Sequence, residues 1–451
     1  MVGPASESRT FFSSWHRAGP DRSLISKRGQ SELQNHGNPE RLRLLVVSHV
    51  LPFPGDSGQQ QRVRLTLQSL RSRFHVTVAV PSSSSDEAVL REKLLEHCDD
   101  VIIVPSGADH GMLAKSGKYL AGAVYCSWSG EKWSNYVIGQ LQFSPSRMGQ
   151  LADSGHYDCV LYEYWHANAS TEVFRSRGIP TVLDMHNILW QARDRELKNR
   201  RLLPSWARRP LVVRYRKREE RAWNRYDGLI TVNWAEHGYA STRVKRDIQL
   251  FHVPMGVQLD RWTYRWNPAQ PPRIAYYGGL TSPHNQRSAR ECVLEIMPIV
   301  WKEYPTAEIW VVGSNPPPDI LALASDRVKV TGFMEDVGPI LGLMSAVLCP
   351  WKGTYGFRSR VIEAMALGIP VIVTPDAVYG MDLDPGRGLI LAESVEEMAG
   401  KLIELLRDPA LAREHSLAAR QQVTERFAFA HTYERFAVEL EQWLRMQRAP
   451  K

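Results

Sequence analysis

Short apolar runs alternate with stretches of helical composition along most of this chain, and this alternation is the feature that most constrains its fold. In residues 346–373 an apolar run is followed by a glycine loop, a helical stretch and a second apolar run. Strands of a parallel sheet are buried on both faces and need a crossover of this kind. Because the pattern recurs in both halves of the chain, the sequence predicts an α/β fold of two doubly wound, Rossmann-like parallel sheets.

The chain is too long for one ordinary core, so its 451 residues are expected to divide into domains. We expect a disordered polar tail over residues 1–40, an N-terminal Rossmann-like domain over 41–260 and a linker over 261–273. A C-terminal Rossmann-like domain over 274–427 follows, and residues 428–451 form a helix that is a candidate for crossing back to the N-terminal domain. Two facing parallel sheets bind ligands in the cleft between them.

The composition is that of a globular protein of a reducing compartment. No uninterrupted apolar run reaches the roughly 18 residues that a membrane span requires. The start of the chain lacks the apolar core of a secretory signal. The five cysteines have no paired spacing, and no Cys or His cluster suggests zinc. We therefore expect a cytoplasmic protein.

The net charge of +8 is concentrated in one segment. Residues 191–225 contain thirteen Lys or Arg and four Asp or Glu, and the remainder of the chain is nearly neutral. The segment also holds three aromatic residues, Trp206, Tyr215 and Trp223. Such a composition suits the inner face of an anionic membrane, a phosphate-bearing substrate or nucleic acid. A solvated basic helix with internal ion pairs is equally open. Since no nucleic-acid-binding module is recognisable, no nucleic-acid partner is expected.

The start of one predicted helix has the chemistry of an anion site. Gly356 allows a sharp turn, and Arg358 and Arg360 stand beside a helix start, where unpaired backbone N–H groups already favour an anion. Glu363 is unsuited to the same anion and more naturally accepts hydrogen bonds from hydroxyls such as those of a ribose. The alternative is that the arginines are solvated and that Glu363 pairs with one of them.

Several segments together resemble the GT-B glycosyltransferases of the large retaining family called group 1 or family 4. In the second half they are YYGGLTSPHNQRSA (276–289), EIWVVGS (308–314), VKVTGFMEDV (328–337) and GTYGFRSRVIEAMALGIPVIVT (353–374). In the first half they are PGDSGQQQRVRLTLQSL (54–70), DMHNI (184–188) and FHVPMGVQLDRW (251–262). The resemblance covers residues 41–448 and implies two facing Rossmann-like domains.

The resemblance implies an enzyme that transfers a sugar from a nucleotide-diphosphate sugar to a glycan or lipid-linked acceptor. Retention of configuration and a role in polysaccharide or glycolipid synthesis are also implied. His186 matches the family's histidine near the transferred sugar and is the implied catalytic residue. The donor would be bound by Gly58, Gly278, Gly279, Arg287, Gly356, Arg358, Arg360 and Glu363. Arginines can stabilise the leaving diphosphate, so neither a metal nor a cofactor is expected.

Departures from the family pattern leave two other functions open. Tyr355 stands where the family has a first glutamate, and Met255 replaces a common asparagine. The usual basic pair after the first strand of the C-terminal domain is represented only by Arg287. A sugar-nucleotide epimerase has the same architecture, and a degenerate protein would bind a nucleotide or glycan without turnover. The basic segment 191–225 adds peripheral membrane contact as an expectation.

Overall fold

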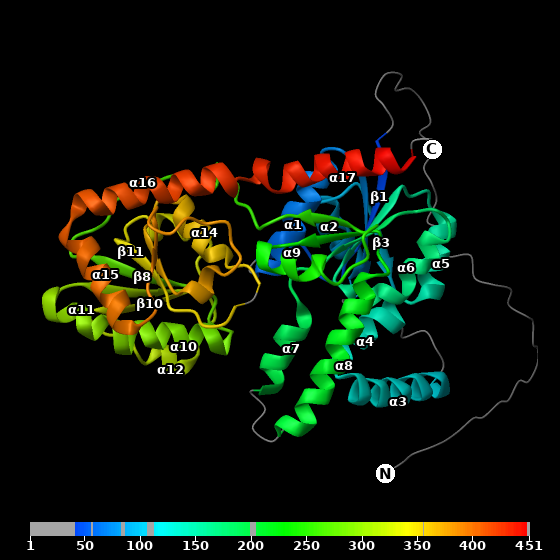
Figure 1. Ribbon diagram of the computed structural model, residues 1–451, viewed down its shortest axis with the longest axis horizontal. Coiled ribbons are helices and arrows are strands. Elements are labelled where there is room, and N and C mark those ends of the chain that lie inside the picture. The colour runs from blue at the N-terminus through cyan, green and yellow to red at the C-terminus, as the bar shows by residue number, and fades with distance from the viewer. Residues whose placement is uncertain are drawn as a thin grey trace, which may run out of the picture. The chain divides into compact units, whose positions relative to one another are not determined.

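The computed structural model describes residues 41–55, 57–82, 86–105, 112–198, 204–354 and 356–448. The expected tail over residues 1–40 lies outside these ranges, as does Tyr355. Two parallel sheets, each covered by helices, make up the described chain, which is the α/β architecture that the sequence predicts (Figure 1).

The N-terminal domain is built on a parallel sheet with the strand order β3-β2-β1-β4-β5-β6-β7. Its central strands are apolar and buried, as expected for a sheet with helices on both faces, whereas the two edge strands are partly exposed. The strands are β1 (Arg43–Val47), β2 (His75–Pro81), β3 (Asp100–Val104), β4 (Cys159–Glu163), β5 (Thr181–Asp184), β6 (Gly228–Thr231) and β7 (Gln249–His252).

Helices connect these strands. The first, α1, begins at a capping box in which Ser57 and Gln60 each bond the backbone N–H of the other. The helices are α1 (Gly58–Arg71), α2 (Glu87–Leu95), α3 (Met112–Ser129), α4 (Trp133–Tyr136), α5 (Pro145–Ser154), α6 (Thr171–Arg175), α7 (Leu189–Lys198), α8 (Ser205–Trp223) and α9 (Trp234–Ser241). A π-helical turn over Val137–Gln142 and a 3-10 turn over Trp165–Ser170 interrupt the regular helices.

The C-terminal domain has a second parallel sheet, with the order β10-β9-β8-β11-β12-β13. Its strands are β8 (Arg273–Tyr277), β9 (Glu308–Val312), β10 (Val328–Gly332), β11 (Ala346–Cys349), β12 (Val371–Val373) and β13 (Leu389–Leu391). Its helices are α10 (Pro283–Glu291), α11 (Met297–Glu303), α12 (Pro318–Leu321), α13 (Gly338–Leu341), α14 (Ser359–Ala366), α15 (Val395–Arg407) and α16 (Pro409–Arg426), with a π-helical turn over Cys292–Ile296 and 3-10 turns over Pro375–Val378 and Phe429–His431.

Both sheets reverse their strand order at one point, between β1 and β4 in the first and between β8 and β11 in the second. At such a point the loops leaving two neighbouring strands diverge and open a crevice at the carboxyl end of the sheet. The loops after β1, β8 and β11 carry three of the glycine segments that the sequence singles out. The topology therefore sets the position of a ligand site before any side chain is considered.

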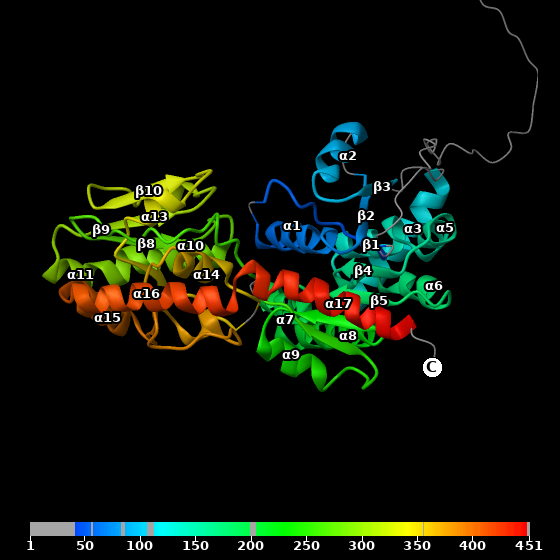
Figure 2. The ribbon, with the colours of Figure 1, turned by 90° about the horizontal axis from the view of Figure 1, so that it is seen from above.

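The last helix, α17 (Tyr433–Arg448), packs against the N-terminal domain although it follows the C-terminal one in sequence. It lies along α1 in Figure 2, and one apolar face of it is buried in the core beneath that helix. Tyr433, Phe436, Leu440 and Trp443 form that face at the spacing of an amphipathic helix. The chain thus crosses between the domains twice.

The segment over 261–273 does not run free between the domains. Backbone N–H groups of Arg265 and Asn267 donate to the carbonyls of Leu367 and Gly342, at 3.1 and 2.8 Å. Trp262 and Trp266 pack against the core of the C-terminal domain. The proline-containing sequence of segment 261–273 predicts an irregular backbone, but it does not predict these long-range hydrogen bonds.

The basic segment 191–225 covers parts of α7 and α8, with residues 199–203 outside the description. Tyr215 and Trp223 are buried, so the prediction of a surface with three interleaved aromatic residues is wrong for these two. They share one face of α8 with Val212 and Ala222, and that face packs on the domain core. Only Trp206 of the three is exposed.

Candidate functional site

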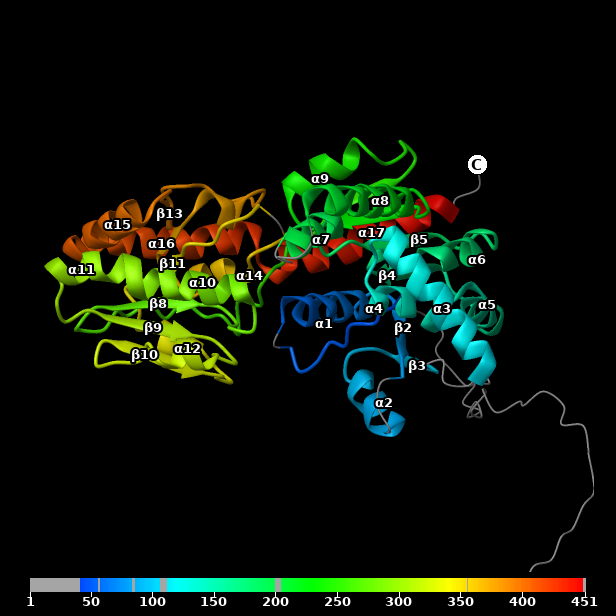
Figure 3. The ribbon, with the colours of Figure 1, turned by 90° about the horizontal axis from the view of Figure 1, so that it is seen from below.

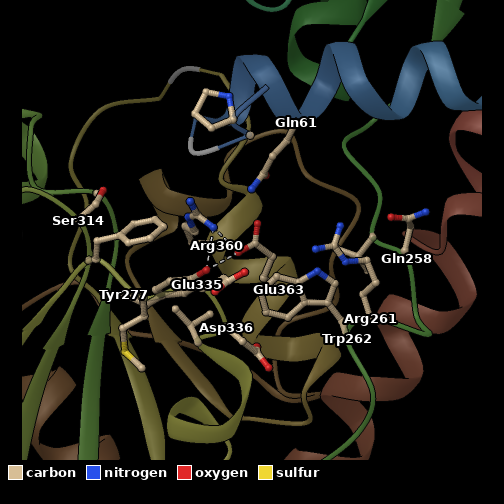
Figure 4. A pocket seen from close by; sticks show the side chains of 18 of the residues that line it. Gln61, Gln258, Arg261, Trp262, Tyr277, Ser314, Glu335, Asp336, Arg360 and Glu363 are labelled. Atoms are coloured by element: carbon tan, nitrogen blue, oxygen red, sulfur yellow. Dashed lines mark hydrogen bonds and ion pairs between the residues drawn. The ribbon is translucent and has the colours of Figure 1, made fainter. Parts of the chain in front are cut away.

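A cavity of about 870 Å³ lies at the carboxyl ends of the C-terminal strands and is bordered on its other side by the N-terminal domain (Figure 4). The N-terminal domain contributes the loop before α1 and the first turns of that helix. The connecting loop at 256–262 forms one wall, and the loops after β8, β9 and β10 with the start of α14 form the rest. The cavity is therefore at the place that parallel topology favours for a ligand.

A buried cluster of three polar side chains forms the floor. The Tyr277 hydroxyl donates to Glu363 Oε2 at 2.7 Å, and the Arg360 guanidinium donates to the same oxygen at 2.6 Å and to the Tyr277 oxygen at 2.7 Å. Figure 4 shows the three side chains pointing toward one another on the cavity wall. Glu363 thus pairs with one of the two arginines, as in the alternative drawn from the sequence, and it still lines the cavity.

Tyr277 and Arg360 both keep their protons in this cluster. Burial and the neighbouring Glu363 carboxylate raise the pKa of Tyr277 well above its usual value, so its hydroxyl stays protonated. Burial lowers the pKa of Arg360, but Glu363 and Tyr277 outweigh it and hold that pKa above its usual value. Glu363 Oε2 therefore accepts hydrogen bonds from two groups that keep their protons.

Two further arginines line the cavity from the N-terminal side and from the connecting loop. Arg64 lies on α1, Arg261 follows the PMGV segment, and both face the cavity. Burial, and then the charge of Arg261, lowers the pKa of Arg64. Among the described residues no carboxylate bonds either of them, so the pair presents positive charge to whatever fills the cavity. Both stand in segments quoted for the family resemblance, but neither was singled out there.

Two glycine loops hold their backbones in contact at the cavity wall. A Cβ atom on Gly313 would lie 2.0 Å from the carbonyl oxygen of Gly278, so no larger residue fits. Gly279 lines the cavity, and its carbonyl accepts a bond from Asn285 Nδ2 at 2.7 Å. Gly278 supports the wall from behind rather than lining it.

Gly356 is held by the other domain. Its φ of +64° is in the left-handed region, where glycine is favoured, and its carbonyl accepts a bond from Asn233 Nδ2 at 3.0 Å. Asn233 also caps α9 by bonding the N–H of Glu236 at 2.8 Å. Asn233 is thus a contact residue that sequence reasoning missed, since nothing local connects positions 123 residues apart.

Arg287 and Arg358 lie together but outside the cavity lining. Burial, and then the charges of Arg287, Arg195 and Arg358, lowers the pKa of His284. Three arginines thus form a second positive group around His284, and Arg195 is contributed by α7 of the N-terminal domain. Gly58 opens α1 and does not line the cavity, whereas Gly55, with a φ of +95°, does.

His186 lies in a separate buried network at the ends of β4 and β5. Its Nε2 bonds Glu163, its backbone N–H donates to Asp184 Oδ1 at 3.2 Å, and its ring stacks on Tyr164 at 4.2 Å. Its φ of +57° is unusual for a residue with a side chain, which indicates that the surrounding bonds hold it in place. His186 does not line the cavity described above.

The same network contains one grouping of possible metal ligands among the described residues, Glu163, Asp184 and His186. Arg62 competes directly with a cation for it. The Nε of Arg62 donates to both oxygens of Asp184, at 3.0 and 2.7 Å, and both side chains are almost fully buried. A guanidinium in this position supplies the positive charge that a metal would supply.

Because of Glu236 at the start of α9, the stability of the folded state is expected to depend on pH. Burial raises its pKa to about 7, and the backbone amide of Gly356 acts in the opposite direction. The folded state therefore keeps a proton that the unfolded chain loses near its ordinary pKa of 4.5, so this group's contribution to stability falls as pH rises from about 4.5 to about 7. Glu236→Gln should remove that fall. Relative to the parent protein, we expect the variant to gain about 1–3 kcal/mol between pH 5 and pH 8.

Urea unfolding of both proteins at several pH values measures the difference directly, because other titrating groups contribute equally to both. Parallel stability curves across pH 5–8 would show that Glu236 does not titrate in this range.

Comparisons with known proteins show which family and which folds the chain is similar to. Residues 271–408 match the model of the family described as glycosyl transferases group 1. Over 134 residues the chain is 29% identical to phosphatidyl-myo-inositol mannosyltransferase of Propionibacterium freudenreichii. This match covers 29% of the chain and only 33% of that relative, so the chain spans about a third of the length of the curated relative.

Solved structures match over most of the chain. Sucrose-phosphate synthase from Thermosynechococcus elongatus aligns with a TM-score of 0.63 at 17% identity, over 90% of this chain and 99% of its own. Anabaena HepE in complex with UDP and glucose aligns with a TM-score of 0.59 at 14% identity, over 89% and 99%. At such identities these matches show the fold. The chain therefore has the GT-B fold, and its C-terminal domain is similar in sequence to the group 1 glycosyl transferases over residues 271–408.

Proposed function

We propose that this protein transfers a sugar from a nucleoside diphosphate sugar to a glycan or lipid-linked acceptor, with retention of configuration and without a metal or cofactor. One observation carries the proposal. The cavity at the carboxyl ends of the C-terminal strands combines a fixed carboxylate, Glu363, with the guanidinium groups of Arg64 and Arg261. A nucleoside diphosphate needs both kinds of group, since its ribose donates hydrogen bonds and its phosphates are anionic.

Each part of the donor has a candidate partner. Glu363 Oε2 is occupied by Tyr277 and Arg360, and we assign Oε1 to the ribose hydroxyls. The backbones of Gly279 and Gly313 allow close approach of the phosphates, for which the arginines supply the charge. Glu335 and Asp336 at the far wall suit other hydroxyl or amino groups of the donor.

Sugar transfer requires stabilisation of the departing nucleoside diphosphate. As the glycosidic bond breaks, negative charge grows on the nucleoside diphosphate while the sugar becomes oxocarbenium-like. Positive charge that is already in place stabilises this state at no reorganisation cost. Arg64, Arg261 and Arg360 on the lining, with Arg287 and Arg358 beside it, fulfil that requirement.

The relatives support the substrate classes. The matched structure of HepE is a complex with UDP and glucose, and this supports a nucleoside diphosphate sugar as the donor of the present protein. A phosphatidyl-myo-inositol mannosyltransferase acts on a lipid-linked acceptor by its name, which supports an acceptor of that class and a role in glycolipid or polysaccharide synthesis. A cytoplasmic location, on the inner face of the membrane, is part of the proposal. In the part of the chain that the structure describes, no helix is long and apolar enough to cross a bilayer.

A thermal-shift panel with UDP, GDP, ADP, dTDP, CMP and their sugar conjugates, in the presence of EDTA, tests the proposal. A ligand that binds only the folded state raises the melting temperature. One clear responder identifies the base, and the corresponding sugar nucleotide is then incubated with and without acceptors. Release of the nucleotide only with acceptor supports transfer. An epimerised sugar nucleotide without acceptor would identify an epimerase, and binding without any product would identify a degenerate binder.

His186 provides a prediction that separates turnover from donor binding. Because it does not line the donor cavity, His186→Ala should leave the donor Kd within about twofold and lower kcat by about 100-fold, the scale for losing a positioned hydrogen-bond donor. Titration calorimetry and initial rates measure the two quantities. His186→Gln, which keeps a polar group toward Glu163, serves as the matched control for folding. Equal losses in affinity and turnover would assign His186 a structural role.

A further inference from the structure

The helix α3 exposes an apolar face that the proposed reaction does not use. Leu120, Val124 and Trp128 repeat at intervals of four residues, and their exposed fractions are 69%, 64% and 59%. Tyr119 is exposed beside them. A surface helix of a globular domain normally buries such a stripe against its core. Here the stripe points away from the protein.

The opposite side of α3 is firmly attached, so the exposure is not the result of a detached helix. A Cβ atom on Gly122 would lie 2.5 Å from the Tyr136 ring of α4, which means that the two helices are in close contact. Tyr125 lies under the guanidinium of Arg218 on α8, 4.6 Å from ring centroid to charge. The Arg218 guanidinium also bonds Glu131 at 2.7 Å and so links α8 to the turn after α3.

Basic residues of α8 adjoin the apolar stripe. Arg214 donates to the backbone carbonyl of Trp128 at 2.9 Å and its guanidinium lies over the indole ring of Trp128. Trp206, Arg209, Val213, Lys217 and Arg221 are exposed on α8 at intervals of three to four residues. Figures 1 and 3 show α3 and the N-terminal part of α8 along one edge of the N-terminal domain.

These residues form the α3–α8 surface, which consists of Tyr119, Leu120, Val124, Trp128, Trp206, Arg209, Val213 and Lys217. It combines aliphatic groups, three interface-type aromatic residues and positive charge. Residues 112–129, which make up α3, include no Asp or Glu. This is the composition of a helix that lies in the headgroup region of a bilayer.

We infer that the α3–α8 surface docks the protein on an anionic lipid bilayer, with α3 in the headgroup region and the α8 cations over the lipid phosphates. An exposed Leu and Val add nothing to binding of nucleic acid, which is held through phosphates and base stacking. A second copy of this chain would place two positive faces against each other. An anionic bilayer matches both the apolar and the charged part of the surface.

The inference rests on the membrane location that is part of the proposed function and names the surface that makes the contact. Docking itself requires neither donor nor acceptor, so vesicle binding can fail while sugar transfer stands. The surface that contacts the membrane also differs from the one that the sequence predicts. Membrane contact was expected from residues 191–225, whereas Tyr215 and Trp223 of that segment are buried and most of the exposed apolar groups belong to α3. The basic segment supplies the charges and Trp206 only.

Flotation of the full chain with vesicles tests the docking. Vesicles of phosphatidylcholine with 30% phosphatidylglycerol and vesicles of phosphatidylcholine alone are compared at low salt and at about 0.5 M salt. We expect binding to the anionic vesicles that decreases with salt, since the Debye length shortens to a few ångströms. Leu120→Glu combined with Val124→Glu should reduce the partition coefficient about tenfold or more, because two apolar side chains leave the interface.

Controls separate docking from folding and from self-association. Leu417→Glu on α16 is a matched control, since Leu417 is 51% exposed but lies on the C-terminal domain, and it should bind like the parent protein. Equal melting temperatures show that all variants fold. Absence of binding to the anionic vesicles, or equal binding by the parent and the double variant, would overturn the inference. So would light scattering that finds a dimer in the parent protein and a monomer in the double variant, since the surface would then join two copies.

Discussion

Glu363→Ala is expected to weaken binding of the nucleoside diphosphate by about 1–3 kcal/mol, or roughly 5- to 150-fold in Kd. The carboxylate is 3% exposed, its position is fixed by Tyr277 and Arg360, and its loss removes the acceptor that we assign to the ribose hydroxyls. The loss also removes the carboxylate that pairs with Arg360, while the bond from Arg360 to the Tyr277 oxygen remains. Titration calorimetry with the nucleotide identified in the thermal-shift panel measures the effect.

Two other variants make this result specific. Glu291→Ala is the matched control, because Glu291 is a largely buried glutamate of the same domain, pairs with Lys352 at 3.0 Å and does not line the cavity. Its donor affinity should equal that of the parent protein. Glu363→Gln keeps the shape and one acceptor oxygen, so an intermediate affinity is expected. An unchanged Kd for a folded Glu363→Ala variant would place the ribose elsewhere.

Arg62→Met is expected to destabilise the protein by about 3–5 kcal/mol, the cost of leaving one partner of a buried ion pair without its counter-charge. Arg62 and Asp184 are 2% and 1% exposed, and the guanidinium also donates to the carbonyl of Val253 at 3.0 Å. Glu163 lies beside Asp184 on the neighbouring strand and adds a second carboxylate to the same buried network. Urea unfolding followed by circular dichroism measures the loss.

A second arginine on α1 provides a control for the claim that burial makes the Arg62–Asp184 ion pair important for stability. Arg71 at the end of α1 pairs with Asp99 at 3.0 Å, but both side chains are accessible to solvent, so Arg71→Met should cost less than about 1 kcal/mol. Combining Arg62→Met with Asp184→Asn should cost less than the sum of the single changes, since the second substitution removes the uncompensated charge. Similar losses for Arg62→Met and Arg71→Met would show that the buried pair contributes no more than a surface one.

The strands and helices follow closely from local pattern. The apolar runs at 274–277, 308–312, 346–349 and 371–373 lie in strands β8, β9, β11 and β12, and the helical stretch predicted within 346–373 is α14 at Ser359–Ala366. Burial on both faces requires continuous apolar runs, and a glycine or proline ends a helix for local steric reasons. These rules act within about ten residues, so they can be read from the sequence alone.

Some of the site residues were predictable from the sequence, and most of these were identified through the family resemblance. Gly279, Arg360 and Glu363 lie on the cavity, as does the loop before α1. Arg287 and Arg358 lie together outside the lining, and His186 belongs to a different network. Arg64, Arg261 and Asn233 were not identified, because each is an ordinary polar residue until its neighbours in space are known.

The sequence by itself determined the α/β class, the two blocks of strands and helices, the glycine loops and the charged start of α14. The tertiary structure alone decided which of these segments meet. Tyr277 reaches Glu363 because β8 and β11 are neighbours at the point where the sheet reverses, and Asn233 reaches Gly356 across 123 residues. It also decided that Tyr215 faces the core while Leu120 faces solvent. Local propensity fixes the backbone of each element, whereas partners distant in sequence are fixed by strand order and by the burial of apolar faces between elements.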